Sequence, residues 1–444
     1  MKKLASVLAG LALSCWLLPA CSQGQGFTVD PPQPGGDEKP SGPIENDATR
    51  RTLQMGLGWN LGNNLDAYEE DPDDKDYLMP SETVWGNPKV TQRALTRVRE
   101  AGFKTIRIPV TWLAKIGPAP DYRIDAEWMA RVTEVVGYAR SAGFQQVIVD
   151  THHDEDHDNN HWQNLKQASK DPALNARIKE EIKAVWTQIA EHFKDCGDWL
   201  MFEGFNELND GGWGHSAEFK ANPTIQCNIL NEWLQVFVDA VRATGGNNAT
   251  RWLGCATYCA NPAFIQYLVL PVDPAGRLMV SVHFYDPSDF TLGREGPDGK
   301  DYLPYSDWGH TGKDGLKHAG YDEAYVREIF GMLYRDYIAR NIPVYIGEIC
   351  CSRRDKQKDP RGWAFSLYYM EYVAKAARTY CLPAILWDCG GRGVPGPEHH
   401  YYFRHDSGEY YPDAKEAIDV LLRGWYNEDP GYTLQSVYDS APRF

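Results

Sequence analysis

The sequence is short of positive charge. It contains 45 Lys and Arg against 61 Asp and Glu, which gives a formal net charge of −16. Proteins that bind nucleic acid or other polyanions use clusters of basic side chains to neutralise the ligand. The acidic balance therefore argues against a nucleic-acid partner, whereas a neutral ligand would be unaffected by it.

The sequence also lacks long apolar runs, with one exception near its start. Lys2 and Lys3 precede an apolar stretch that ends in LPAC at Cys21. A charged start, a short apolar stretch and small residues at a cleavage site are typical of a secretory signal. A cysteine directly after the small residue resembles the bacterial lipobox. We therefore expect residues 1–20 to be a lipoprotein signal peptide and Cys21 to be lipidated, with plain secretion as the alternative.

Residues 21–45 lack the apolar content of a folded segment. They are rich in Gly, Pro, Ser and Gln, and this composition is typical of a flexible tether. Residues 46–444 contain no second linker and no repeat of fixed period. Such a length suits one large α/β barrel domain. We expect a monomer that reaches a cell membrane, either the outer membrane or the cell surface, only through its lipid anchor.

Metal-binding spacings are missing as well. The segment THHDEDHDNNH (151–161) is rich in His and Asp, but it contains neither HExxH nor another zinc spacing. The pairs Cys255/Cys259 and Cys350/Cys351 do not form a zinc pattern either. Export makes disulfides feasible, but the cysteine spacing does not fix their pairing. We therefore expect no catalytic metal and no cofactor.

What the sequence does contain is a regular alternation of short apolar runs and longer amphipathic stretches. The runs that predict strands are 55–62, 104–110, 146–151, 199–205, 251–257, 278–284, 342–348 and 383–388. The stretches that predict helices are 91–102, 126–143, 176–193, 231–245, 322–341 and 362–379. Strands separated by helices in this way predict an α/β fold, namely a (β/α)₈ TIM barrel.

Polar or aromatic functional side chains stand where seven of these strands end. They are Asn63, Arg107, His152, Glu207, His283, Glu348 and Trp387. In TIM barrels the carboxyl ends of the strands carry the active site. Two of the seven are glutamates, and retaining glycoside hydrolysis needs two carboxyl groups only about 5 Å apart. Two unrelated surface glutamates are the alternative, but the ends of the fourth and seventh strands can converge on one bound atom.

Taken together, these residues resemble glycoside hydrolase family 5, the cellulase family of clan A. The likeness covers nearly all of the chain after the tether. Glu207, preceded by Asn206, matches the acid/base of that family, and Glu348 matches its nucleophile. The other matching positions are Arg107 in IRIP, His152 in DTHHDE, His283 and Tyr285 in VHFYDP, and Trp387 in ILWD. The resemblance implies a retaining glycosidase that needs no cofactor.

The expected role of Arg107 is to keep Glu348 ionised at neutral pH through its positive charge. Tyr285 can donate a hydrogen bond to the same carboxylate. Glu203 lies within the fourth strand, where an isolated charge would be strongly unfavourable. We therefore expect Glu203 to be a structural residue that pairs with a neighbouring cation.

The remaining matched residues are expected to act on the sugar and on the acid. Asn206 is suited to bind the sugar 2-hydroxyl. His152, its neighbour His153 and His283 are expected to bind substrate hydroxyls or to orient the acid. Glu207 must be protonated when it meets the glycosidic oxygen, and a second carboxylate nearby favours that state.

Tryptophans in the loops after strands form a further group of candidates, because indole rings stack on pyranose faces. They are Trp85, Trp112, Trp162, Trp213, Trp308 and Trp387. For each of them packing in the core is the alternative, except for Trp387, which stands at a family position. Trp308, together with Asn63, is included among the expected substrate-binding residues.

The segments GWNLGNNLDA (58–67) and TVWGNPKVT (83–91) resemble subfamily 4 of the family. That likeness implies an endo-β-1,4-glucanase acting on xyloglucan, mixed-linkage glucan or cellulose-type chains. Leu208 replaces the proline that commonly follows the acid, and Cys389 replaces a common asparagine, which puts the substrate preference in doubt.

Two other functions remain open from the sequence. One is a β-mannanase or xylanase on the same barrel, because selectivity depends on loops such as 286–320. The other is a surface glycan-binding protein without catalysis. Intact Glu207, Glu348 and Arg107 argue against the second alternative, since binding alone does not need them.

Overall fold

The structure is a computed structural model that describes residues 45–71, 74–155, 162–295, 301–313, 320–391 and 400–444. The chain divides into two units, residues 1–38 and 39–444. The expected signal peptide, Cys21 and nearly all of the tether lie outside the described residues. Among the described helices, none is long and apolar enough to cross a membrane.

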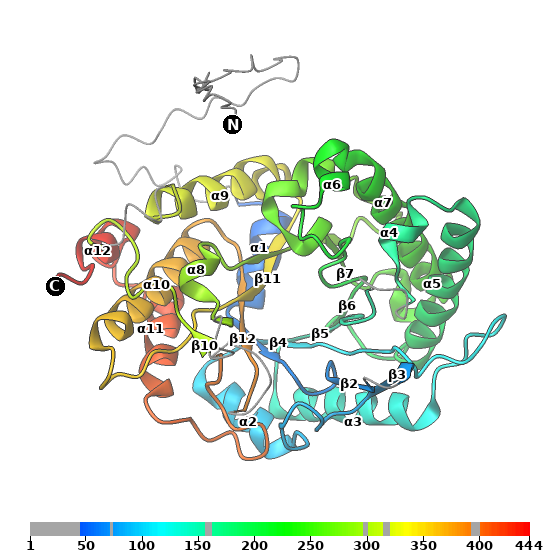
Figure 1. The fold of residues 1–444 in the computed structure, drawn as a ribbon, viewed down its shortest axis with the longest axis horizontal. Helices are drawn as coiled ribbons and strands as arrows, with labels where there is room; N and C mark the ends of the chain where they lie inside the picture. The colour runs from blue at the N-terminus through cyan, green and yellow to red at the C-terminus, as the bar shows by residue number, and fades with distance from the viewer. Residues whose placement is uncertain (1–44, 72–73, 156–161, 296–300, 314–319, 392–399) are drawn as a thin grey trace, which may run out of the picture. The chain divides into compact units, whose positions relative to one another are not determined.

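Eight parallel strands close into a barrel in the order β1-β12-β11-β8-β7-β6-β5-β4 (Figure 1). Their bounds are Gly58–Leu61 (β1), Thr105–Ile108 (β4), Gln146–Val149 (β5), Leu200–Glu203 (β6), Leu253–Ala256 (β7), Leu278–Phe284 (β8), Val344–Ile349 (β11) and Ala384–Asp388 (β12). Every strand overlaps one of the predicted runs. The predicted (β/α)₈ barrel is confirmed.

The six predicted helices are present around the barrel. They are Gln92–Ala101 (α2), Ala126–Ala142 (α3), Pro172–His192 (α5), Pro223–Ala243 (α7), Glu323–Asp336 (α9) and Pro360–Thr379 (α10). Their ends follow from the local sequence: α3, for example, begins where the Asp125 side chain accepts from Trp128 N. It ends at Gly143, whose left-handed backbone (φ 88°) favours glycine.

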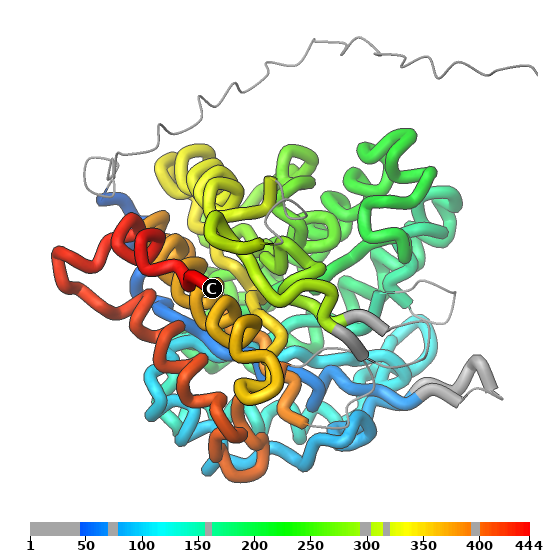
Figure 2. Tube along the Cα trace, turned by 60° about the vertical axis from the view of Figure 1, so that its left-hand side comes forward, coloured from blue at the N-terminus to red at the C-terminus, as the bar shows by residue number. Residues whose placement is uncertain are grey.

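Several further elements were not predicted. The helices are Asp47–Met55 (α1), Leu165–Ala168 (α4), Ala217–Ala221 (α6), Ser288–Thr291 (α8), Ala414–Tyr426 (α11) and Leu434–Asp439 (α12). Two small antiparallel sheets are formed by Tyr68–Asp71 (β2) with Asp74–Pro80 (β3), and by Arg294–Glu295 (β9) with Asp301–Tyr302 (β10). Figure 2 shows the C-terminal helices, in orange and red, running beside one another.

The barrel has two separate apolar regions, one inside and one outside. A small cluster that includes Met201, Met279 and Tyr345 fills the interior. A large cluster between the strands and the helices includes Val282, Ile346 and many other side chains. Successive strand residues face these two regions in turn, as expected for a closed barrel.

Strand β11 departs from this alternation at Gly347. Ile346 pairs with Val282, and Glu348 pairs with His283, so one extra residue lies between two consecutive pairs. A β-bulge of this kind re-aims the side chain that follows it. A Cβ on Gly347 would lie only 2.9 Å from His283 Nε2, which leaves no room for a larger residue.

The eight cysteines of the described residues carry free thiols, and all of them except Cys196 are buried.

Candidate active site

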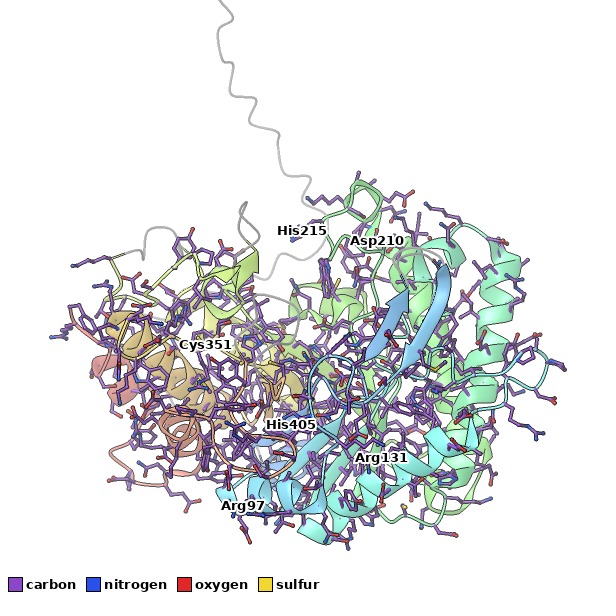
Figure 3. All side chains as sticks on the ribbon, turned by 60° about the horizontal axis from the view of Figure 1, so that its bottom comes forward. Arg97, Arg131, Asp210, His215, Cys351 and His405 are labelled. Atoms are coloured by element: carbon purple, nitrogen blue, oxygen red, sulfur yellow. The ribbon has the colours of Figure 1, made fainter. Side chains whose placement is uncertain are left out.

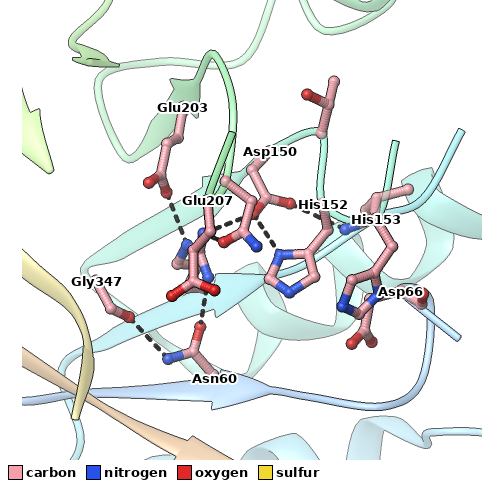
Figure 4. Close-up of polar contacts among 12 residues, drawn as sticks. Asn60, Asp66, Asp150, His152, His153, Glu203, Glu207 and Gly347 are labelled. Atoms are coloured by element: carbon pink, nitrogen blue, oxygen red, sulfur yellow. Dashed lines mark hydrogen bonds and ion pairs between the residues drawn. The ribbon is translucent and has the colours of Figure 1, made fainter. Parts of the chain in front are cut away.

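Arg107 on β4 is fully buried at the carboxyl end of the barrel and contacts three carboxylates. Two of them, Asp150 and Glu203, are labelled in Figure 4. Its Nε donates to Glu203 Oε2 at 2.7 Å, and its Nη1 donates to Glu348 Oε1 at 2.8 Å. Its Nη2 donates to Asn206 Oδ1 at 2.9 Å and lies 2.7 Å from Asp150 Oδ2. Burial lowers the pKa of Arg107, but the carboxylates outweigh burial and raise it overall. Asn60 Oδ1 also accepts from Nη1 at 3.2 Å, so one guanidinium positions five side chains.

Glu203 has the structural role predicted for it. It is the last residue of β6 and is fully buried. Besides the ion pair with Arg107, its Oε1 accepts from Ser281 Oγ at 2.7 Å. The expectation that Glu203 pairs with a neighbouring cation is confirmed.

Glu348 lies beyond the bulge of β11 and receives the two predicted donors. Arg107 donates to Oε1, and the Tyr285 hydroxyl donates to Oε2 at 2.8 Å. Burial nevertheless raises the pKa of Glu348 from 4.5 to about 7. His283, Arg107 and Tyr285 act against burial, and the Glu207 carboxylate acts with it. Arg107 therefore acts on Glu348 in the expected direction, because its charge lowers the pKa of that carboxyl, but desolvation is the larger effect.

Glu207 lies four residues beyond Glu203, in the loop that follows β6. Its Oε1 lies 2.6 Å from His283 Nδ1, and the same nitrogen lies 3.5 Å from Glu348 Oε2. One oxygen of Glu207 lies within 4.8 Å of one oxygen of Glu348. The side chain of Glu207 is 17% exposed and that of Glu348 is 7% exposed, so Glu207 is the more accessible carboxylate.

His152 lies beside this pair and is held by Asp150, whose Oδ2 is 2.9 Å from His152 Nδ1. Burial lowers the pKa of His152 well below its usual value, so the ring is neutral. A neutral ring that donates from Nδ1 to Asp150 leaves Nε2 as an acceptor. The ring also stacks on Trp387, with centroids 5.5 Å apart and planes 7° apart. The orientation of the His152 ring is therefore fixed, with Nδ1 as the donor and Nε2 as the acceptor.

His153 continues the row of rings away from Glu207. Its ring lies edge-on to His152, with centroids 4.5 Å apart, and its Nδ1 lies 2.9 Å from the carbonyl oxygen of Asp66. Trp85 and Tyr68 contact the other side of His153, at 5.3 and 5.9 Å between centroids. These rings form a continuous row of contacts that begins at the buried Trp387, and its partly exposed members are His153, Trp85 and Tyr68.

Asn63 lies at the carboxyl end of β1, as predicted, with a left-handed backbone (φ 59°). Its N–H donates to Asp66 Oδ2, and its carbonyl accepts from Asn87 Nδ2.

The expectation that Trp308 binds substrate is wrong. The ring has 0% exposure and packs against Tyr368, Tyr369 and Tyr372. Its Nε1 donates to the carbonyl oxygen of Tyr321. A fully covered ring has no face for a sugar, so Trp308 is a core residue and not a substrate-binding one.

The other loop tryptophans differ in their exposure. Trp112 is also fully buried and belongs to the core. Trp85 and Trp162 are partly exposed, and Trp162 Nε1 donates to Asp154 Oδ1. Trp213 is the most exposed of the set, at 49%.

Two groups of side chains among the described residues have the spacing of metal ligands. The first is Asp66 with His152 and His153, and the second is Glu207 with His283 and Glu348. Both oxygens of Asp66 already accept backbone N–H groups, from Asn63 and Asn64. The second group is the carboxylate pair itself. His157 and His161 lie outside the described residues, and the absence of a catalytic metal stays a prediction.

Three residues of the site were not found from the sequence. Asp150 joins Arg107 to His152, and its Oδ1 accepts from Val110 N. Asn60 Oδ1 accepts from Arg107 Nη1, while Asn60 Nδ2 donates to the bulge carbonyl of Gly347. Ser281 binds Glu203. The available clue was a polar residue within or just beyond a buried strand, which must find a partner.

Comparison with known proteins gives a consistent result. Residues 66–393 match the family described as Cellulase (glycosyl hydrolase family 5). Endoglucanase A of Paenibacillus barcinonensis is 33% identical over 368 residues, covering 79% of this chain and 84% of that protein.

Two solved structures extend the comparison. A native Bacteroidetes-affiliated GH5 cellulase, linked with a polysaccharide utilization locus, superposes with a TM-score of 0.81 at 39% identity, over 90% of this chain and 99% of that one. A GH5-4 broad specificity endoglucanase from Bacteroides salanitronis superposes with a TM-score of 0.75 at 45% identity, over 84% and 93%.

Proposed function

The chain belongs to glycosyl hydrolase family 5 and is a cellulase-like glycoside hydrolase acting on glucans, and from that premise we propose that it is a retaining endo-β-1,4-glucanase. The spacing of the carboxylate pair carries the proposal. An oxygen of Glu207 lies within 4.8 Å of an oxygen of Glu348. Retaining enzymes keep the two groups about 5 Å apart, whereas inverting enzymes separate them by about 6.5–9.5 Å to admit a water.

In this proposal Glu348 is the nucleophile. A Glu348 oxygen forms a bond to the anomeric carbon as the glycosidic C–O bond breaks, which gives a glycosyl ester on Glu348. Arg107 and Tyr285 hold the carboxylate by its two oxygens. Asn206, held by Arg107 Nη2, is the proposed partner of the sugar 2-hydroxyl.

Glu207 is the proposed acid/base. In the first step it gives its proton to the leaving oxygen, and in the second it takes a proton from the water that attacks the ester. His283 lies beside Glu207 and Glu348, so it is placed to orient the acid. His152 Nε2 is the proposed acceptor for a substrate hydroxyl, as deduced from its bond to Asp150.

The proposed substrates are β-1,4-linked glucans such as xyloglucan, mixed-linkage glucan or cellulose-type chains. The description of one similar protein as a broad specificity endoglucanase supports this range. The partly exposed rings of His153, Trp85 and Tyr68 suit neutral pyranose faces.

A panel of polysaccharides assayed for new reducing ends, with the products sized, tests the proposal. We expect internal cleavage of β-glucans, unchanged by EDTA. Cleavage of mannan or xylan alone would replace the proposed substrate, and binding without new reducing ends would indicate a glycan-binding protein.

The raised pKa of Glu348 predicts how the activity depends on pH. The nucleophile must be ionised, so kcat/KM should fall as the pH drops through the pKa of Glu348. Tyr285→Phe removes a donor that stabilises the ionised carboxylate and therefore raises this pKa further. We expect the acidic limb of the kcat/KM profile to move to higher pH by about one unit.

Tyr432→Phe is the matched control for this prediction. It removes another hydroxyl that donates to a carboxylate, that of Glu371, and it should leave the profile in place. If the acidic limb of the kcat/KM profile stays in place in Tyr285→Phe, the ionisation of Glu348 does not determine that limb.

For location, we propose a lipoprotein anchored through Cys21, supported by the LPAC sequence. Cys21→Ser should move the protein from the membrane fraction to the soluble fraction, or leave it unprocessed. The thermal stability of the barrel should stay the same, because the Gly- and Pro-rich composition of the tether is not that of a core segment. Unchanged fractionation of the variant with the membrane would rule out lipidation at this position.

A further inference from the structure

Asn60 lies on β1 and is fully buried. Its side-chain amide makes contacts in two directions. The Nδ2 group donates to the carbonyl oxygen of Gly347 at 2.9 Å, and the Oδ1 atom accepts from Arg107 Nη1 at 3.2 Å. Two longer contacts, of 3.4 Å each, join Nδ2 to the carbonyl oxygens of Ile385 and Leu386 on β12. The donor and the acceptor of this amide therefore both have partners.

The carbonyl of Gly347 belongs to the β-bulge of β11. Strand β12 lies between β1 and β11 in the barrel, so the Asn60 side chain reaches past one strand to contact the bulge. The register between β11 and β12 is also interrupted there, between Ile346 and Ile349. A bulge locally disrupts the ladder of backbone hydrogen bonds. The Asn60 amide thus supplies a donor to a backbone carbonyl where the ladder is interrupted (Figure 4).

The guanidinium nitrogen that binds Asn60 is the same one that binds the proposed nucleophile. Arg107 Nη1 donates to Glu348 Oε1 at 2.8 Å as well as to Asn60 Oδ1. Glu348 directly follows Gly347 in the chain. The contacts therefore close a ring, which runs from the amide through the guanidinium to the carboxylate and returns along the backbone through the bulge. One side chain thus contacts both the backbone that carries the carboxylate and the cation that binds it.

The strand that carries Asn60 is anchored on its other face. Trp59, the preceding residue, packs in the layer between the strands and the helices. Its Nε1 donates to Asp388 Oδ2 at 2.9 Å, and its ring lies edge-on to that of His405, with centroids 5.2 Å apart. His405 is labelled in Figure 3. Strand β1 therefore gives Asn60 a fixed position from which its amide can hold the bulge and the guanidinium.

We propose that Asn60 is a positioning residue for the nucleophile, which holds the bulge and Arg107 in place so that Glu348 meets the anomeric carbon. This inference rests on the proposed function, in which a Glu348 oxygen forms a bond to that carbon. Reacting atoms must approach to about 3–3.5 Å in a defined direction, and a displacement of about 1 Å costs on the order of 10²-fold in rate. Removal of the amide should therefore slow bond formation more than it weakens substrate binding.

A dinitrophenyl 2-deoxy-2-fluoro-β-cellobioside measures the bond-forming step alone. Its leaving group departs as dinitrophenolate without needing a proton, while a Glu348 oxygen bonds to the anomeric carbon, and the fluorine slows hydrolysis of the resulting ester. The amount of dinitrophenolate released counts the active sites. The rate of release at saturation measures bond formation, and the concentration that gives half of that rate measures binding.

Asn60→Leu keeps a side chain of similar shape but makes neither hydrogen bond. We expect the saturating rate per active site to fall about 100-fold, with the half-saturating concentration within about threefold of the wild type. Asn60→Ala leaves space for a water that can bridge the two partners, so its rate should fall less, by about tenfold. A merely structural residue would instead lower the number of active sites and leave the rate at each of them unchanged.

Asn248 provides a matched control, because it is a fully buried asparagine with the same two kinds of partner. Its Oδ1 accepts from Arg251 Nε at 2.6 Å, and its Nδ2 donates to the carbonyl oxygen of Ala190 at 2.7 Å. It lies in the turn Gly246–Ala249, before β7 and therefore at the end of the barrel opposite to the carboxylate pair. Asn248→Ala should lower the melting temperature as Asn60→Ala does, but it should leave the saturating rate per active site unchanged.

A saturating rate per active site within about twofold of the wild type in both Asn60 variants would overturn the positioning role. So would a loss confined to the half-saturating concentration. An equal fall in rate in Asn248→Ala would also overturn it, because the loss of any buried amide would then have the same effect. A wild type that releases no stoichiometric dinitrophenolate would instead refute the nucleophile role of Glu348 in the proposed function, and this inference with it.

Discussion

Glu348→Ala will lose activity on the order of 10⁴-fold or more, on polysaccharides and on aryl glycosides alike. Without this carboxylate the anomeric carbon has no nucleophile, and a better leaving group does not supply one. The variant keeps Glu203 and Asp150 on Arg107, so the buried guanidinium is still paired. The measurement is kcat/KM with both kinds of substrate, together with a thermal melt to show that the barrel is folded.

Glu323→Gln is the control for losing a buried carboxylate. Glu323 lies at the start of α9, where it accepts from the Tyr368 hydroxyl, and its replacement should leave activity intact. The stereochemistry provides an independent check. Two displacements at one carbon retain the β-configuration, so the first product seen by NMR from the wild type should be the β-anomer. An α-configured first product would mean inversion and would remove the nucleophile role from Glu348.

Glu207→Ala will lose about 10³-fold on polysaccharides, where the departing alcohol needs a proton. A dinitrophenyl glycoside departs without one, so it should still form the glycosyl ester on Glu348. Hydrolysis of that ester should then be slow for lack of a base, and a burst of dinitrophenol should precede slow turnover.

Azide distinguishes this variant from Glu348→Ala. It needs no base, and the space left by the Glu207 side chain admits it, so turnover of the dinitrophenyl glycoside should recover and give a β-glycosyl azide. In Glu348→Ala, any azide product should have the opposite configuration. Equal losses for good and poor leaving groups in Glu207→Ala would assign the acid role to another residue.

Much of the site follows from the sequence because its residues occupy strand ends, and strand ends can be located from apolar runs. Glu207 follows the run that the structure confirms as β6, and Glu348 lies near the end of the run that it confirms as β11. The pairing of Glu203 follows from elementary electrostatics, because a charge within a buried strand must find a partner.

The parts that the sequence does not predict depend on which side chains meet across the barrel. Asp150 gives no local indication that it joins Arg107 to His152, because that contact depends on the register of β4 against β5. Trp308 and Trp112 stand in loops after strands, as sugar platforms do, but the surrounding side chains cover them completely. The pKa of Glu348 is a balance between burial and charge, and only the structure gives the amount of burial.

The bulge at Gly347 reverses the alternation of inward and outward side chains along β11. In β11, Tyr345 faces the barrel axis and Ile346 faces the helices, so counting by twos would assign position 348 to the helix side. The extra residue reverses the parity, so that Glu348 pairs with the inward His283 and Ile349 returns to the outer layer. The side chain of Glu348, the proposed nucleophile, therefore points into the barrel because Gly347, which has no side chain, forms the bulge before it. A method that reads strand faces by parity alone would place this glutamate outside the barrel.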